Sequence, residues 1–292
     1  MTSVFAVGGV ALLFAAVVSI VAPRGVTVTG SLAWIGLAVL PLYLVAVWIN
    51  RRRPDHPQSR RLLLVATAST VGVAVEAVIR LAFAESSSTA WLWWANLLFQ
   101  LTAILTEIGA AQLFATYPDG TVEKAWQKTV VRLSWWWLVL PPLLALASPT
   151  VPVDSWLINP TPSVPNPVAV PWLAPLAPLV NAVYLSHLCA LLATLLLIAR
   201  FRTADREQRR RMQLLVWVVA FGAAVLVVAA LLTVAGVQRA VIRVVESLFL
   251  VILFMVAVSI VVGVMRYRLY DIDVIVRRSV VFGALSVVIA IV

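Results

Sequence analysis

The chain alternates between long apolar runs and short polar or proline-rich connections. Eight runs approach or reach the roughly 20 apolar residues with which a helix crosses a hydrocarbon layer about 30 Å thick. A ninth begins near residue 280 and reaches Val292. We therefore predict an all-α, polytopic transmembrane helical bundle with about eight complete spans and a truncated ninth. The predicted complete spans are residues 4–22, 31–49, 62–84, 91–115, 133–149, 173–199, 214–236 and 246–265.

Composition agrees with this pattern, because 63% of the residues are hydrophobic and 12% are charged. Soluble domains are about half apolar and a quarter charged. The single cysteine, Cys189, excludes an intrachain disulfide and a zinc cluster. The first run lacks a basic leading segment, so we interpret it as a retained helix and not as a signal peptide. The last run is too short to span, and we expect the natural protein to continue beyond Val292.

Basic residues gather in alternate connections and predict the orientation of the chain. The formal net charge is +10, and the even-numbered connections hold 18 of the 22 lysines and arginines. Positively charged connections stay on the cytoplasmic side. We therefore predict a multi-pass protein of the bacterial inner membrane with a cytoplasmic N-terminus, with the lipid bilayer and not nucleic acid as the partner of its surface. The basic clusters lie within residues 51–61, 124–132, 200–211 and 266–278.

One outer connection, residues 150–172, is long and rich in proline. Such a composition favours extended, polyproline-like backbone. It is either a stiff connector with tryptophan anchors at the interface or a lid that contacts a ligand.

Four ionisable residues inside the predicted spans are candidate functional residues, because charge in the bilayer is costly. Glu76 and Arg80 are four residues apart and share a helical face, so they form either a structural pair that neutralises itself or a ligand site. Helical rise puts Glu107 and His187 at similar depth, between the midplane and the inner leaflet. A contact between them would sense protons or form an interhelical hydrogen bond.

The segment after the eighth span is the second candidate region. Residues 266–278 have basic ends around an amphipathic middle, which suits a helix or loop at the cytoplasmic interface. Its candidate coupling residues are Arg266, Arg268, Asp271 and Asp273. The two aspartates lack the further ligands of a metal site. Upstream, Tyr117-Pro118-Asp119-Gly120 is a strong turn signal.

Catalytic signatures are missing from the 292 residues. The sequence has no glycine-rich phosphate loop, nucleophile elbow, HExxH or nucleotide-binding motif. We predict no catalytic, cofactor-binding or metal-binding residue in this chain.

Three motifs carry a resemblance to a known family. The string RYRLYDIDVIVRRSVVFG, residues 266–283, closely resembles the juncture of a family of actinobacterial membrane sensor histidine kinases. The YPDG turn is similar to that family's FPDG motif, with Tyr117 in place of phenylalanine, and Arg209-Arg210-Arg211-Met212-Gln213 is similar to its RRRQ-type segment. The three occur in family order.

The resemblance implies a division of the chain and a function. Residues 1–265 would form a sensory input bundle, residues 266–279 a cytoplasmic juncture, and residues 280–292 part of a further span. The full-length homodimer would bind ATP and Mg²⁺ beyond Val292, autophosphorylate on histidine and pass phosphate to a response regulator. The alternatives are a transporter or permease that uses Glu107 and His187, and a membrane scaffold without a kinase region.

Overall fold

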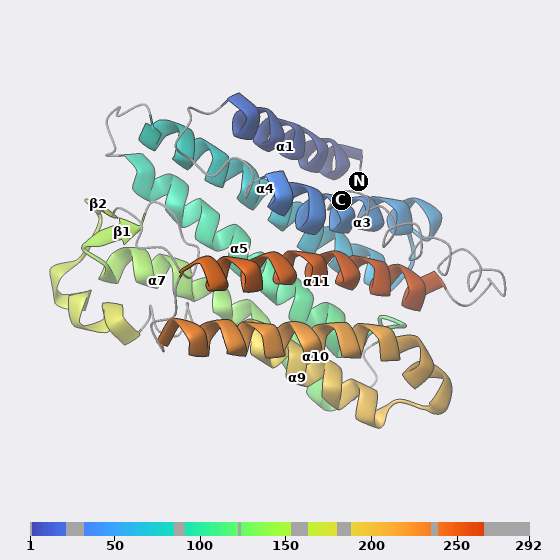
Figure 1. The fold of residues 1–292 in the computed structure, drawn as a ribbon. Coiled ribbons are helices and arrows are strands. Elements are labelled where there is room, and N and C mark those ends of the chain that lie inside the picture. The colour runs from blue at the N-terminus through green and yellow to red at the C-terminus, as the bar shows by residue number, and fades with distance from the viewer. Residues whose placement is uncertain are drawn as a thin grey trace.

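The protein is a bundle of helices that run back and forth between two ends (Figure 1). The computed structural model describes residues 2–21, 32–84, 91–121, 124–152, 163–179, 188–234 and 239–265. The only strands in these residues are one short pair, so the prediction of a helical fold is confirmed.

The α-helices are α1 (Thr2–Val21), α3 (Leu40–Arg52), α4 (Pro57–Ala84), α5 (Leu92–Thr116), α6 (Ala125–Leu133), α7 (Leu140–Ala147), α9 (Leu188–Thr203), α10 (Arg206–Val234) and α11 (Arg239–Met265). A π-helical stretch, η1 (Ile35–Val39), leads into α3, and two 3₁₀ stretches are η3 (Ser134–Val139) and η4 (Pro171–Leu176). The strands are β1 (Thr150–Pro152) and β2 (Ser163–Pro165). The irregular stretches η1 and η3 both precede prolines, which lack the backbone donor that a regular helix needs.

Four helical stretches among the described residues are long and apolar enough to cross a membrane. They are Leu32–Arg52, Pro57–Ile79, Leu92–Thr116 and Ala125–Ala147. Two further apolar helical stretches, Val4–Ile20 and Leu250–Val264, are shorter. These helices indicate a membrane protein, with fewer membrane-length helices than the eight spans predicted from hydropathy.

Several helices begin well before the predicted spans. Helix α4 begins at Pro57 instead of residue 62, α10 at Arg206 instead of 214, and α11 at Arg239 instead of 246. The hydropathy pattern marks only the apolar part of a helix. Backbone hydrogen bonding continues through the adjoining polar residues, because arginine, glutamate and glutamine are good helix formers.

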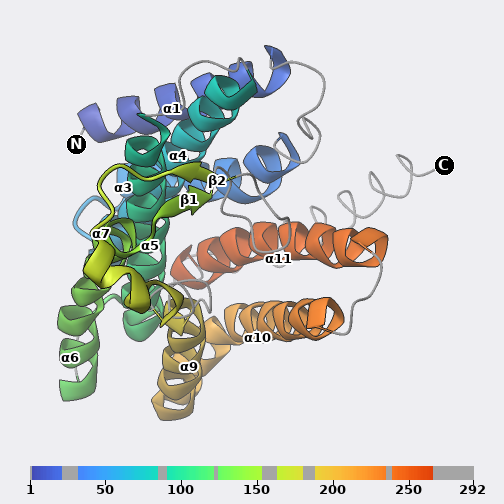
Figure 2. The same ribbon diagram turned by 90° about the vertical axis from the view of Figure 1, so that its left-hand side faces the viewer.

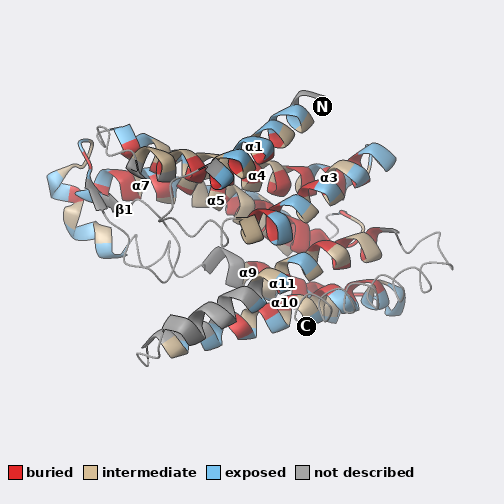
Figure 3. Cartoon of the chain, turned by 45° about the horizontal axis from the view of Figure 1, so that its top comes forward, coloured by how far each residue is buried: buried red, intermediate tan, exposed pale blue. Residues whose placement is uncertain are grey.

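Helices α4 and α5 lie side by side at the centre of the bundle, and many of their residues are buried (Figure 3). Their backbones approach closely at two glycines. A Cβ on Gly109 would lie 2.5 Å from Cγ2 of Val65, and one on Gly72 would lie 2.8 Å from Oγ1 of Thr102. Small residues permit this close packing where no water drives helices together.

The proline-rich connection is partly a strand pair, which the sequence analysis did not predict. Strands β1 and β2 pair antiparallel, with Thr150 opposite Pro165. Asn166 fixes the pair to the end of α7, because its Nδ2 donates to the carbonyls of Ala145 and Ser148 at 2.5 and 2.8 Å. Residues 153–162 of the connection lie outside the described residues.

Connections that carry lysine or arginine gather at one end of the bundle. The α3–α4, α5–α6 and α9–α10 connections lie there together with the final residues of α11, and the β1–β2 pair lies at the opposite end (Figure 1). We call the end that holds these connections the basic end. Figure 2, turned by 90°, shows α10 and α11 running side by side, and α11 also packs against η1 and α3.

Candidate functional site

The YPDG turn after α5 is the centre of the polar network at the basic end. Gly120 has a φ of +78°, and its N–H donates to the carbonyl of Thr116 at 2.8 Å, which caps the helix. A Cβ at this position would also lie 2.9 Å from the backbone nitrogen of Gln58 on α4. Glycine is therefore required both by the backbone conformation and by the closeness of α4, and the predicted turn is confirmed.

Tyr117, the first residue of the turn, is completely buried although it follows the end of a helix. Its hydroxyl donates a hydrogen bond to the carbonyl of Ser259 on α11 at 3.2 Å. These residues are 142 positions apart in the chain. The side chain thus joins the end of α5 directly to the last described helix.

Gly263 makes room for this tyrosine. A Cβ on Gly263 would lie 1.4 Å from the hydroxyl oxygen of Tyr117 and 2.5 Å from its Cζ. Gly263 lies one helical turn after Ser259 on the same face of α11. The two residues form a notch in α11. It holds the phenol ring and provides a hydrogen-bond acceptor for the hydroxyl.

Two arginines from neighbouring helices approach the C-terminal end of α5. Nη1 of Arg61 on α4 donates to the carbonyl of Gly120 at 2.8 Å and to Oγ1 of Thr116 at 2.9 Å. Nε of Arg200 on α9 lies 3.4 Å from the carbonyl of Tyr117, and Arg200 is 1% exposed. Positive charge is favourable here because the last carbonyls of a helix carry partial negative charge.

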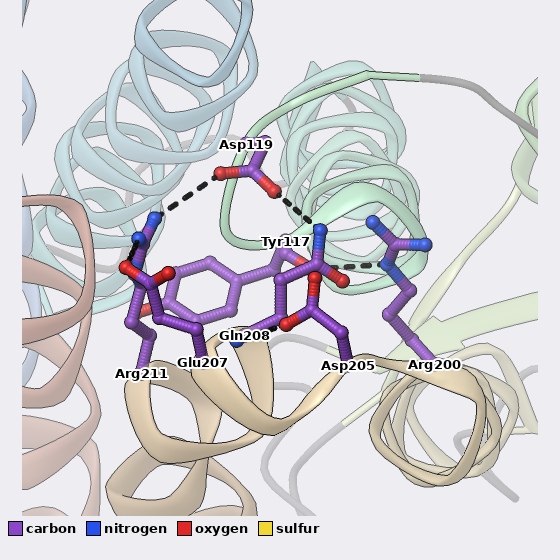
Figure 4. Close-up of polar contacts among 7 residues, drawn as sticks. All are labelled: Tyr117, Asp119, Arg200, Asp205, Glu207, Gln208 and Arg211. Atoms are coloured by element: carbon purple, nitrogen blue, oxygen red, sulfur yellow. Dashed lines mark hydrogen bonds and ion pairs between the residues drawn. The ribbon is translucent and has the colours of Figure 1, made fainter.

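Asp119 connects the turn to α10 (Figure 4). Its Oδ2 accepts a hydrogen bond from Nε2 of Gln208 at 3.0 Å, and its Oδ1 lies 3.6 Å from Nη1 of Arg211. Arg211 is 7% exposed and also pairs with Glu207 one turn earlier in α10. A guanidinium so well buried needs such partners, because unpaired burial of charge is costly.

The start of α10 is itself fixed by local hydrogen bonds. Oδ1 of Asp205 accepts the backbone N–H of Gln208 at 2.7 Å, which is the bond expected of an N-terminal cap. Arg209 donates to the carbonyls of Ala204 and Arg202 at 2.9 and 2.8 Å. The α9–α10 connection is therefore held in one conformation beside the YPDG turn.

Burial determines the ionisation of two groups near this turn. It raises the pKa of Tyr117, an effect that Arg211 partly offsets, so the phenol stays neutral and remains a donor. Burial lowers the pKa of His56, with Arg53 acting in the same direction and Asp119 against it. The Nδ1 of His56 accepts the backbone N–H of Gln58 at 3.2 Å, which requires the unprotonated nitrogen.

The residues predicted from sequence lie away from this network or outside the described residues. Glu76 is 7% exposed on α4, and Glu107 is half-buried on α5. The side chain of Arg80 and the whole of His187 lie outside the described part, so the contacts proposed for the pairs Glu76–Arg80 and Glu107–His187 stay predictions. The same holds for Arg266, Arg268, Asp271 and Asp273.

Sequence reasoning identified the YPDG turn but missed its contacts with Arg200, Arg211 and Gly263. It interpreted Arg200 and Arg211 as charged residues of a cytoplasmic connection, whereas both are buried. It gave no role to Gly263. The available signals were the YPDG string and the position of a glycine in the last turn of α11, but neither says which surfaces meet.

The described members of the network are joined by hydrogen bonds and ion pairs. The described residues contain no group of three or more histidine, cysteine, aspartate or glutamate side chains that could hold a metal ion. Comparison with protein-family models, curated proteins and solved structures gives no match.

The notch predicts that Gly263→Ala destabilises the protein by about 1–3 kcal/mol, because the added methyl group overlaps the phenol. Tyr117→Phe should cost about 1 kcal/mol through loss of the hydrogen bond to Ser259. Unfolding in detergent micelles, followed by tryptophan fluorescence, measures both.

In a Tyr117→Ala background the cost of Gly263→Ala should largely disappear. Equal costs in the two backgrounds would contradict the notch, and Gly36→Ala, which meets nothing within 4 Å, is the control.

The lowered pKa of His56 predicts acid destabilisation. Above pH 6.5 the imidazole is neutral in both folded and unfolded protein and contributes nothing. As the pH falls through 6.5, the unfolded chain takes up a proton that the folded protein resists, so stability decreases until the folded protein is protonated as well. The midpoint of thermal unfolding should therefore fall more between pH 7.5 and 5.5 for the natural sequence than for His56→Asn. Parallel pH curves for the two proteins would refute this assignment.

Proposed function

We propose that the chain is the membrane input region of a two-component sensor histidine kinase. The observation that carries the proposal is the meeting of the family-like motifs. Tyr117 and Asp119 of the YPDG turn contact α11 and α10, and Arg211 belongs to the arginine-rich segment of α10. Helix α11 ends at Met265, directly before the RYRLYDID string that begins at Arg266.

The proposed role of the network is to couple the helices to the juncture. Tyr117 lies in the notch of α11 that Ser259 and Gly263 form. This notch is only a few residues before the start of the juncture. A stimulus that moved α5 against α11 would have to displace this side chain. The input therefore acts by favouring one of two arrangements of these helices, and the stimulus must bind or strain the two arrangements differently.

The proposed membrane arrangement has eight spans before the juncture, with the basic end in the cytoplasm. Support comes from the alternation of the helices between the two ends in Figure 1 and from the arginine-rich connections at one of them. With the N-terminal end of α1 on the cytoplasmic side, α11 returns the chain to that side at Met265.

The same proposal extends to the partners of the full-length protein. It would be a homodimer that binds ATP and Mg²⁺ through a region after Val292 and transfers phosphate to a response regulator. The support is the resemblance of three segments to that family, residues 117–120, 209–213 and 266–283. The 292 residues themselves carry no catalytic signature.

The orientation predicts which cysteines a membrane-impermeant maleimide reaches in intact cells. In a Cys189→Ala background, Thr203→Cys lies at the basic end and Thr150→Cys at the opposite end, and both native side chains are exposed. Thr150→Cys should be labelled in intact cells, whereas Thr203→Cys should react only after permeabilisation. The reverse pattern would overturn the orientation and the signalling proposal that uses it.

The kinase proposal is tested by extending the protein past residue 292. We expect the downstream coding sequence to encode a cytoplasmic ATP-binding domain, and membranes that contain the full product to incorporate acid-labile phosphate from ATP and Mg²⁺. Gly263→Ala should change the rate of incorporation, because it disturbs the notch next to the juncture, while Gly36→Ala should leave it unchanged. A downstream sequence without an ATP-binding domain would exclude the kinase.

A further inference from the structure

The arginines at the start of α10 differ in whether their guanidinium groups contact other described residues. Arg209 donates to the carbonyls of Ala204 and Arg202, and Arg211 turns inward to Asp119. Arg206 and Arg210 are exposed and have no hydrogen-bond or ion-pair partner among the residues that the structure describes. Arg209 and Arg211 therefore hold the fold together, whereas the guanidinium groups of Arg206 and Arg210 remain at the surface.

Arg206 and Arg210 are four residues apart and lie on one face of α10. Like charges at this spacing repel each other, unless an anion lies between them or counterions screen them. The pair is thus arranged to accept an anionic group from outside the protein.

The same face becomes apolar farther along the helix. Leu214, Trp217 and Phe221 continue it at spacings of three or four residues, and their side chains are 37%, 68% and 55% exposed. Leu214 lies about 6 Å beyond Arg210 along the axis, and Trp217 roughly 10 Å beyond it. This distance is comparable with the depth of the headgroup layer of a bilayer, which is roughly 5–8 Å on each side.

We propose that the Arg206–Arg210 face of α10 binds the phosphate of an anionic phospholipid, with Leu214, Trp217 and Phe221 against its acyl chains. The apolar part selects a lipid over a soluble anion, because it offers contact area only to a molecule with a hydrocarbon tail. The paired guanidinium groups select an anionic headgroup over a zwitterionic one, whose own ammonium group would be repelled. This inference rests on the proposed membrane span of α10 and not on the proposed signalling function.

Thermal unfolding of the detergent-purified protein tests the proposal, with titration of dioctanoyl-phosphatidylglycerol, dioctanoyl-phosphatidylcholine or inorganic phosphate. We expect phosphatidylglycerol to stabilise the protein at a lower concentration than phosphatidylcholine. Arg210→Gln should reduce this preference roughly fivefold, and Arg206→Gln with Arg210→Gln roughly twenty-fivefold, because each arginine near an anionic headgroup contributes about that factor.

Arg209→Gln is the matched control, because it removes the same charge from the neighbouring position while its guanidinium is already bound to carbonyls. It should leave the ratio of the two lipid affinities unchanged, whatever it does to stability. Three results would overturn the proposal: no preference between the two lipids, an equal loss of preference in Arg209→Gln, or equal protection by inorganic phosphate. The last would identify a site for free anions.

Discussion

The burial of Tyr117 against α11 is the constraint on which the basic end of this protein depends. The phenol ring occupies a notch that exists only because residue 263 has no side chain, and its hydroxyl finds an acceptor in the carbonyl of Ser259. A buried hydroxyl without a partner would cost the free energy of its lost hydration. The position and rotation of α11 are therefore tied to the end of α5, far away in the sequence.

Charge at this end has two physical roles. Arg61, Arg200 and Arg211 are directed into the protein, where they meet carbonyls of the YPDG turn or the carboxylate of Asp119. These contacts compensate the end of α5 and join it to α4, α9 and α10. Arginines such as Arg206 and Arg210 remain at the surface. A positively charged connection is thus both an orientation signal and a set of tertiary contacts, and the fold determines how its members are divided.

The apolar surface of the described helices suits a membrane protein. Apolar side chains on α1, α3 and α10 are exposed among the described residues, and a hydrocarbon surrounding would make their exposure favourable. Close approach of α4 and α5 then depends on small residues such as Gly72 and Gly109 and on dispersion contacts. Polar contacts also join helices away from the basic end, since Oγ of Ser69 on α4 and Oγ1 of Thr106 on α5 lie 3.2 Å apart.

The sequence by itself determined the helical class, the apolar runs, the turn at Gly120 and the grouping of arginines in alternate connections, because these follow from local composition and backbone preference. It predicted apolar spans but not that α4, α10 and α11 begin several residues before them, since hydropathy reports solvent and not hydrogen bonding. It had no means to distinguish Arg210 from Arg211 or to pair Tyr117 with Gly263. Those facts depend on the rotation of each helix relative to its neighbours, and only the tertiary packing decides that.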